Sequence, residues 1–381
     1  MLELHKQPLK TLYLILRGVV AVLKLPVWLA LSALPWTRQR RSWDFTRSFA
    51  VRILKELVPV SFAVLVFPPQ EVRPAADARG DWVWVEPVPH LVAGEVLEAA
   101  AINGVESVRV YGCMQALEGV EGSGSRHAEP GERIIYYIHG DGYICREWIK
   151  EAPTFSRAFL INYRFSQGPP LKPANPFPAA LIDALAGYNY LVHTLGFAPQ
   201  NIILAGESAG AHLALVLTRY LVLNILPGLA PPRALMLASP VADWGRSHVG
   251  KPCWVRNEAT DMCQACIDYV PRALLCSLSG EYVRTSPWFS PGSLDILDSR
   301  GLFRGLPPTL VIGGGAEILL DPIRTLRDRL VDDLGEAKVE YLEVADSLHA
   351  FIAMSWHEPE RSQTNAKLAE WSTRMFSAEL L

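Results

Sequence analysis

The chain has 381 residues, half of them hydrophobic and a fifth charged, which is enough to bury the core of one large domain or of a domain with appendages. Its 36 basic and 39 acidic residues give a formal net charge of −3. Because the two kinds of charge nearly balance, the composition does not indicate that the protein binds nucleic acid.

The amino-terminal segment 11–35 is rich in Leu and Val, but Arg17 and Lys24 interrupt it. It therefore lacks the unbroken apolar run of about 18 residues that indicates a spanning helix. Lys10, Arg17 and Lys24 recur every seven residues and form a narrow basic stripe on a helix expected to end near Pro26. Such a helix suits a membrane interface. Two alternatives stay open: the helix could pack on the protein's own body, over the active-site mouth, or it could span a membrane at a tilt. We expect no removable signal peptide.

From about residue 80, short β-rich runs alternate with helical patterns. The runs that we predict to be strands are 108–111, 134–138, 158–163, 202–205, 235–238, 309–312 and 339–344. Helices are predicted over 178–195 and 209–223, and the second is apolar nearly all round. Continuous apolar strands predict an α/β fold with a mostly parallel sheet covered on both faces. In such sheets the ligand site lies at the carboxyl ends of the strands.

A glycine-bearing loop, H-G-D-G-Y at residues 139–143, follows the strand predicted at 134–138. Acyl transfer needs donors where the oxyanion of the tetrahedral intermediate forms, and a loop of small residues can present backbone N–H groups there. Asp141 stands where a third glycine is expected, and its N–H can still donate. We expect His139 to hold this loop by hydrogen bonds. The alternative is that residues 139–143 form an ordinary turn with no role in catalysis.

The run 202–205 leads directly into G-E-S-A-G at residues 206–210, and a helix follows. This is the G-x-S-x-G motif in the strand–turn–helix context that its mechanism requires. Small neighbours allow a sharp turn that presents the Ser208 hydroxyl, and the helix amino terminus favours developing negative charge. We therefore predict that Ser208 is a nucleophile rather than part of a simple linking turn.

Four of the six cysteines lie close together, at Cys253, Cys263, Cys266 and Cys276. The inner pair has C-x-x-C spacing, but the outer cysteines are too distant for a zinc ribbon or finger. We favour packed or reduced thiols over a zinc site. No metal or organic cofactor is expected.

Two acidic candidates for orienting a catalytic histidine follow the run 309–312. Asp321 precedes Pro322, the pattern of a helix N-cap with proline at N1, so its presence has a structural explanation. Glu317 has none and lies nearer the strand end. We predict Glu317 as the orienting acid, with Asp321 as the alternative and Asp243 after them.

The general base should come last in the chain. His349 follows the strand predicted at 339–344 within D-S-L-H-A-F, at a strand end. His357 is the other late histidine, but a charged stretch follows it. His212 lies one turn into the helix after Ser208 and is expected to be a packed core histidine.

At this point the residues match a family. The chain resembles the hormone-sensitive-lipase-like branch of the α/β-hydrolases, which includes arylacetamide deacetylases and microbial carboxylesterases. The likeness covers roughly residues 130–360, and the motifs that carry it are 139–143, Asn162-Tyr163-Arg164 with 176–180 and Asp183, 206–210, and 348–351.

The resemblance implies an α/β-hydrolase fold with a helical cap. It implies Ser208 as nucleophile, His349 as base, and oxyanion donors at the N–H groups of Asp141, Gly142 and Ala209. Glu317 occupies the position of the family's acid, where aspartate is usual, and H-G-D-G replaces the usual H-G-G-G.

The expected organisation is amino-terminal helices over 1–75, serving as a membrane interface or part of the cap, and a hydrolase domain over 76–381 with a cap insertion at about 244–305. Several relatives of this kind carry an amino-terminal membrane segment. We expect an intracellular protein in which residues 1–40 could associate with the endoplasmic reticulum or another lipid surface. The sequence does not give the oligomeric state.

The expected function is a serine carboxylesterase that deacylates a hydrophobic small-molecule ester through an acyl-enzyme, for instance in secondary metabolism. Three alternatives stay open. They are a lipase acting on acylglycerols, a non-catalytic small-molecule receptor on the same fold, and a membrane-bound scaffold.

Overall fold

The computed structural model describes residues 3–65, 81–116, 126–140 and 155–377, with every side chain in them except that of Cys266. Within these ranges eight strands form one sheet in the order β1-β2-β4-β3-β5-β6-β7-β8. The strands are β1 (Asp81–Val85), β2 (Val110–Ala116), β3 (Ile134–Ile138), β4 (Arg157–Asn162), β5 (Ile202–Glu207), β6 (Ala234–Ala238), β7 (Thr309–Gly314) and β8 (Val339–Val344). β1, β2 and β4 pair antiparallel and every other pair is parallel. The predicted mostly parallel α/β-hydrolase sheet is confirmed.

The strands differ in detail from the predicted runs. β1 was not predicted, and β2 begins two residues later than expected and extends to Ala116. β5 and β7 each continue two residues further, to Glu207 and Gly314. These extra residues matter for the site, because they carry each strand directly to a functional side chain.

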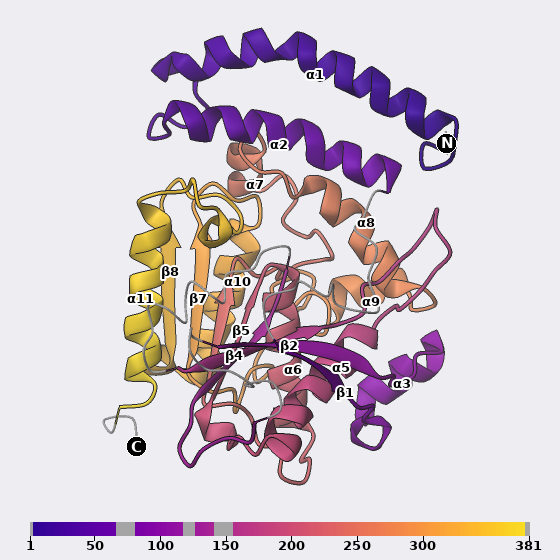
Figure 1. Ribbon diagram of the computed structural model, residues 1–381, viewed down its shortest axis with the longest axis vertical. Coiled ribbons are helices and arrows are strands. Elements are labelled where there is room, and N and C mark those ends of the chain that lie inside the picture. Colours follow the sequence, from indigo (N-terminus) through magenta and orange to yellow (C-terminus); the bar gives the residue numbers. More distant parts are fainter. Residues whose placement is uncertain (1–2, 66–80, 117–125, 141–154, 378–381) are drawn as a thin grey trace.

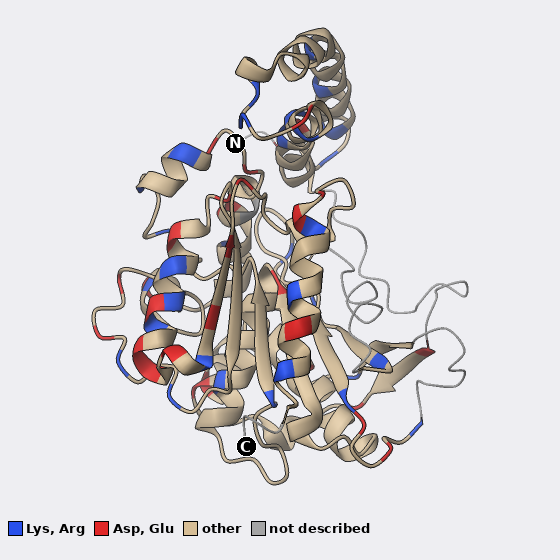
Figure 2. Cartoon of the chain, turned by 90° about the vertical axis from the view of Figure 1, so that its left-hand side faces the viewer, with Lys and Arg blue, Asp and Glu red and all other residues tan. Residues whose placement is uncertain are grey.

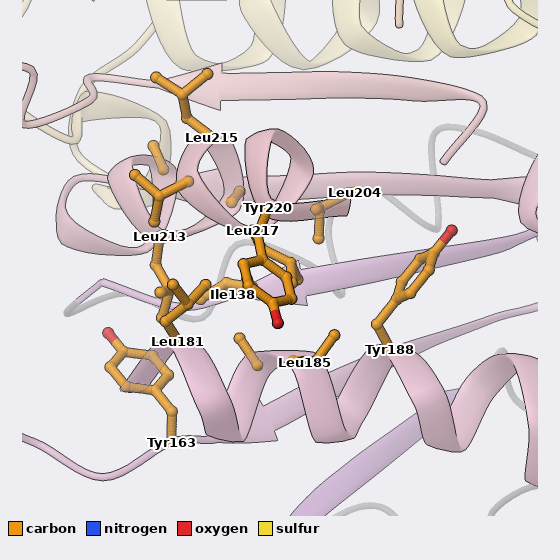
Figure 3. Packing of buried hydrophobic residues seen from close by; sticks show 14 of the residues in the cluster. Ile138, Tyr163, Leu181, Leu185, Tyr188, Leu204, Leu213, Leu215, Leu217 and Tyr220 are labelled. Atoms are coloured by element: carbon orange, nitrogen blue, oxygen red, sulfur yellow. The ribbon is translucent and has the colours of Figure 1, made fainter. Parts of the chain in front are cut away.

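Helices cover both faces of the sheet (Figure 1). They include α3 (Gly94–Asn103), α5 (Ala179–Asn189), α6 (Ala209–Leu223), α10 (Leu320–Leu334) and α11 (Glu360–Arg374). Side chains of α5 and α6, such as Leu181, Leu185, Leu213 and Leu217, meet in one buried cluster (Figure 3). Charged positions concentrate on the flanking helices rather than on the central strands (Figure 2).

Alternation along the strands divides the core into two layers. In β3, Tyr136 and Ile138 point into the cluster beneath α5, α6 and α10, whereas Ile135 and Tyr137 point into the opposite cluster. The opposite cluster contains Trp371 of α11 together with Trp43, Val51 and residues from the loop after β8. The predicted helix 209–223 is buried on nearly every side, as its composition indicated.

The amino-terminal segment forms a helical hairpin of α1 (Leu9–Ala33) and α2 (Phe45–Val64), seen along the upper edge of Figure 1. The predicted end near Pro26 is wrong. α1 continues through Pro26 to Ala33, since the loss of one backbone N–H does not outweigh the remaining helical hydrogen bonds.

The basic stripe of α1 faces α2. Arg17 and Lys24 both pair with Glu56 of α2, the second at 2.8 Å. The opposite face of α1 exposes large apolar side chains, namely Leu12, Leu14, Ile15, Leu16, Val19, Val22, Leu23, Val27 and Leu29. By length and composition alone, α1 is the one helix among the described residues that could cross a membrane.

Three helices lie between β6 and β7, in the segment predicted as a cap insertion: α7 (Pro252–Asn257), α8 (Gln264–Leu275) and α9 (Gly280–Thr285). α2 runs above α7 and α8 (Figure 1) and contacts α8. The amino-terminal hairpin and the insertion are therefore stacked at one end of the hydrolase body.

Candidate active site

Ser208 stands at a sharp turn between β5, which ends at Glu207, and α6, which begins at Ala209. Its backbone has φ 56° and ψ −121°, an unfavourable combination for a residue with a side chain. Gly206 and Gly210 make the turn feasible, because a Cβ on Gly210 would overlap the Ile138 carbonyl and one on Gly206 would overlap Gly210 itself. The small residues of the motif thus allow the turn at Ser208 to pack tightly against the end of β3.

His349 reaches Ser208 from the turn after β8. Its Nε2 lies 2.8 Å from the Ser208 hydroxyl oxygen, and its Nδ1 lies 2.8 Å from Oε2 of Glu317. The His349 side chain is only 10% exposed. The structure therefore brings together the three residues predicted as nucleophile, base and acid, with the base between the other two.

Glu317 is fully buried just beyond β7. Besides His349, its carboxylate accepts hydrogen bonds from the hydroxyl of Ser239, at 2.6 Å, and from the backbone N–H of Gly314, at 2.5 Å. Ser239 also accepts a hydrogen bond from the Ala350 N–H at 3.3 Å. Ser239 was not among the predicted site residues, although its position directly after β6, at a strand end, was a usable signal.

The electrostatics of the pair follow from burial and mutual contact. Burial disfavours the charged imidazole, but the hydrogen bond and the negative charge of Glu317 outweigh it, and they raise the pKa of His349 to about 9. Burial raises the pKa of the Glu317 carboxyl, and its bonds with His349 and Ser239 oppose that rise. The arrangement thus stabilises an imidazolium, the species that forms when a histidine accepts the serine proton.

The rival carboxylates bind elsewhere. Asp321 accepts a hydrogen bond from the Cys253 N–H at 3.0 Å, and Asp243 bonds to Nδ1 of His248 at 2.9 Å. Asp321 is also not the N-cap that the sequence predicted. α10 begins at Leu320 with Leu319 as its cap residue, so Asp321 lies inside the first turn, where it bridges to α7.

The predicted oxyanion donors are described only in part, because Asp141 and Gly142 lie outside the described residues. Ala209 is the first residue of α6, so its N–H is one of the amino-terminal groups that have no acceptor within the helix. Gly140 packs against the turn at Ser208, because a Cβ added to Gly140 would come within 2.6 Å of the Glu207 carbonyl oxygen. The loop therefore starts beside Ser208.

His139 takes part in fixing the start of that loop. Its carbonyl accepts a hydrogen bond from the Tyr163 hydroxyl at 2.7 Å, and its ring stacks on Tyr163 with centroids 4.8 Å apart. Burial lowers the pKa of His212 to about 4, as expected for a packed core histidine. His357, the other late histidine, supports the base loop instead, because its Nε2 accepts the Leu348 N–H at 3.3 Å.

Across the part of the chain that the structure describes, no group of three or more His, Cys, Asp or Glu side chains could hold a metal ion. Cys253 and Cys263 are buried and Cys276 is exposed, while the Cys266 side chain lies outside the description.

Known proteins resemble this chain in sequence. The profile of the alpha/beta hydrolase fold family matches residues 135–353. An esterase of Acinetobacter venetianus is 28% identical over 265 residues, which are 68% of this chain and 80% of the relative. An acetyl-hydrolase of Streptomyces hygroscopicus is 30% identical over 244 residues, 61% of this chain and 72% of the relative.

Solved structures share the fold. An esterase/lipase from an uncultured bacterium superposes with a TM-score of 0.55 at 23% identity, covering 86% of this chain and 99% of that one. EstE5-PMSF superposes with a TM-score of 0.51 at 25% identity, covering 70% and 86%.

Proposed function

The chain belongs to the α/β-hydrolase fold family, in its hormone-sensitive-lipase-like branch, and from this premise we propose that it is a serine esterase in which Ser208 is the nucleophile, His349 the general base and Glu317 the group that orients the base. The observation that carries the proposal is the continuous chain of contacts from the Ser208 hydroxyl through His349 to Glu317. The esterase and acetyl-hydrolase relatives support the same reaction class.

The mechanism follows from the positions of the atoms. As the Ser208 oxygen attacks the ester carbonyl, Nε2 of His349 takes its proton, and Glu317 stabilises the resulting imidazolium. The Ala209 N–H stabilises the oxyanion of the tetrahedral intermediate, together with the proposed donors Asp141 and Gly142; one such donor contributes about 2.7–4 kcal/mol. His349 returns the proton to the leaving alcohol. Water then attacks the acyl-enzyme by the same route and releases the acid.

Ester hydrolysis by wild type and by Ser208→Ala tests this proposal. With p-nitrophenyl acetate and butyrate we expect turnover to fall by at least about 1,000-fold in the variant, and we expect a fluorophosphonate probe to label only the wild type. Equal rates in the two proteins, or equal labelling, would contradict the assignment of Ser208.

For the substrate we propose a hydrophobic small-molecule ester with a short acyl group, as found in secondary metabolism. The aromatic residues of the segment after β6 and the apolar outward face of α1 support a hydrophobic substrate. The acetyl-hydrolase relative supports a short acyl group. A series of esters that varies the acyl chain and the alcohol separately tests this. Loss of kcat/KM with acyl length and gain with alcohol bulk is expected, whereas a preference for long acyl chains would favour the lipase alternative.

The second part of the proposal is that α1 lies on a lipid surface. Its outward face is apolar, with Leu16 and Leu23 among the most exposed side chains, while the charges of Arg17 and Lys24 are directed to Glu56 of α2. Crossing a bilayer would require these ion pairs to break and α1 to leave α2, which is itself packed on the hydrolase body. Lying along the surface buries the apolar face and keeps the pairs.

Vesicle flotation tests this location. Replacing Leu16 and Leu23 together by Asp removes about 1.5–3 kcal/mol of transfer free energy for each leucine, so we expect the fraction bound to phosphatidylcholine vesicles to fall at least tenfold. Leu297→Asp, at a still more exposed leucine outside the hairpin, is the control and should float like the wild type. Undiminished flotation of the double variant, or wild-type protein that resists alkaline carbonate extraction as a spanning protein does, would contradict surface binding.

A further inference from the structure

The segment that joins α1 to α2 contacts the turn that carries the base. The Ser42 hydroxyl donates to Oδ2 of Asp346 at 2.6 Å, and the Trp43 indole N–H donates to the Asp346 carbonyl at 2.8 Å. Arg40 lies 3.5 Å from the other carboxylate oxygen of Asp346. The Trp43 ring is almost completely buried in the same cluster as Leu348. The turn that carries His349 is thus held at Asp346, three residues before the histidine, by a segment that lies outside the sheet.

The loop that carries the acid is held by residues at and after the end of α7. The side-chain amide of Asn257 donates to the carbonyls of Gly315, at 3.1 Å, and Glu317, at 2.6 Å. The Thr260 hydroxyl donates to the Ala316 carbonyl at 2.9 Å. Asn257 is fully buried. Its placement therefore sets the path of the backbone on which Glu317 stands.

Arg40 connects these two supports. Its guanidinium donates to the side-chain oxygen of Asn257 while it faces the carboxylate of Asp346. Arg256 also approaches that oxygen, at 3.4 Å. A guanidinium can only donate, so this contact fixes the oxygen of Asn257 toward Arg40 and leaves the NH₂ group for the Glu317 loop.

We propose that Arg40 is a positioning residue for the Glu317–His349 pair, and that the amino-terminal segment is in this way a working part of the active site. This inference rests on the proposed function. Glu317 and His349 stand on separate loops after β7 and β8, and they meet only if both loops keep their relative position. Displacement of a catalytic group by about 1 Å can cost about 100-fold in rate. Arg40 directly links Asn257, which supports the Glu317 loop, to Asp346 in the loop that carries His349.

The test is Arg40→Gln in the full chain, assayed with a soluble p-nitrophenyl ester. We expect kcat to fall at least tenfold with KM changed less than twofold. A looser contact with Glu317 lowers the pKa of His349, so the base stays neutral to lower pH and the acid limb of the kcat/KM profile should move at least half a unit downward. The matched control is Arg52→Gln, because Arg52 of α2 bonds to the Thr37 carbonyl and to neither loop; it should keep wild-type kcat and pH profile.

Unchanged kcat in Arg40→Gln, an equal loss in Arg52→Gln, or a loss without movement of the pH limb would overturn the inference. If Arg40→Gln does not fold, Asp346→Asn tests the same link from its more exposed end, with a smaller loss and the same direction of pH shift expected and an unchanged profile as the contrary result. Failure of the proposed function is distinguishable, since it would leave the wild type itself without Ser208-dependent turnover.

Discussion

Two glutamates, one in the hydrolase body and one in the amino-terminal hairpin, organise their surroundings in opposite ways. Glu317 is fully buried and receives three short, directional hydrogen bonds, from Ser239, Gly314 and His349. Glu56 is nearly buried and receives two long basic side chains, those of Arg17 and Lys24, across a helix–helix contact.

The difference shows how the same carboxylate can orient a partner or simply neutralise it. The donors of Glu317 belong to strand ends and tight turns, so the imidazole it holds has one orientation. The partners of Glu56 are flexible side chains, each about a third or more exposed, so the pairing carries little orientational precision. Its effect is to direct the charges of α1 inward and the apolar face outward.

The comparison is tested most strongly by removing the charge of Glu317. Glu317→Gln keeps the shape but can no longer stabilise the imidazolium, so we expect kcat to fall by about 100- to 10,000-fold. Asp321→Asn is the matched variant and should stay within about fivefold of wild type, since Asp321 bonds to a backbone N–H of α7. A larger loss in Asp321→Asn than in Glu317→Gln would reverse the assignment of the acid.

The second largest effect is expected in the pH profile. A general base must be neutral, and Glu317 raises the pKa of His349 to about 9. Activity should therefore be lost as pH falls through that value, by about 50-fold in kcat/KM between pH 9 and pH 7. Initial-rate measurements over pH 5–10 check this, and an acid limb at or below the ordinary histidine pKa of about 6.5 would show that Glu317 does not act on His349 in this way.

Ser239→Ala sharpens the comparison by removing one donor from Glu317. The variant leaves a buried carboxylate oxygen with one hydrogen bond fewer, which costs about 1–3 kcal/mol. We expect a loss of about tenfold in kcat and a lower melting temperature. Ser247→Ala, which removes a hydroxyl from the noncatalytic Asp243, is the control and should lower kcat less than twofold. Equal kinetics for both variants would mean that Ser239 does not position the acid.

The smallest effect is expected at the other glutamate. Glu56→Gln should lower the free energy of unfolding by about 1 kcal/mol or less and leave kcat on a soluble ester within about twofold of wild type. Urea denaturation and the same ester assay measure both quantities. A loss of turnover comparable with that of Glu317→Gln would erase the distinction between an orienting and a neutralising carboxylate.

The sequence predicted which side chains meet at the strand ends, because local patterns carry this information. The G-x-S-x-G context and the late strand end led to Ser208 and His349. The capping argument favoured Glu317 over Asp321, although the helix begins two residues earlier than predicted, at Leu320. Ser239, Asn257 and Arg40 were not predicted, because their contacts join segments far apart in the chain and no spacing records them.

The amino-terminal helix was predicted in kind but not in extent or orientation. Its periodicity correctly placed Arg17 and Lys24 on one stripe, but only the three-dimensional partner, Glu56, decides whether that stripe faces lipid headgroups or protein. Periodicity within one helix cannot identify a residue on another.

The buried indole of Trp43 has a practical consequence for anyone shortening this protein to improve its expression. A cut that removes the apolar first helix is an obvious choice. Starting the gene product at or beyond residue 44, however, would delete a ring that is buried in the same cluster as Leu348. Truncation boundaries should therefore lie upstream of Arg38, whose side chain donates to the Trp43 carbonyl.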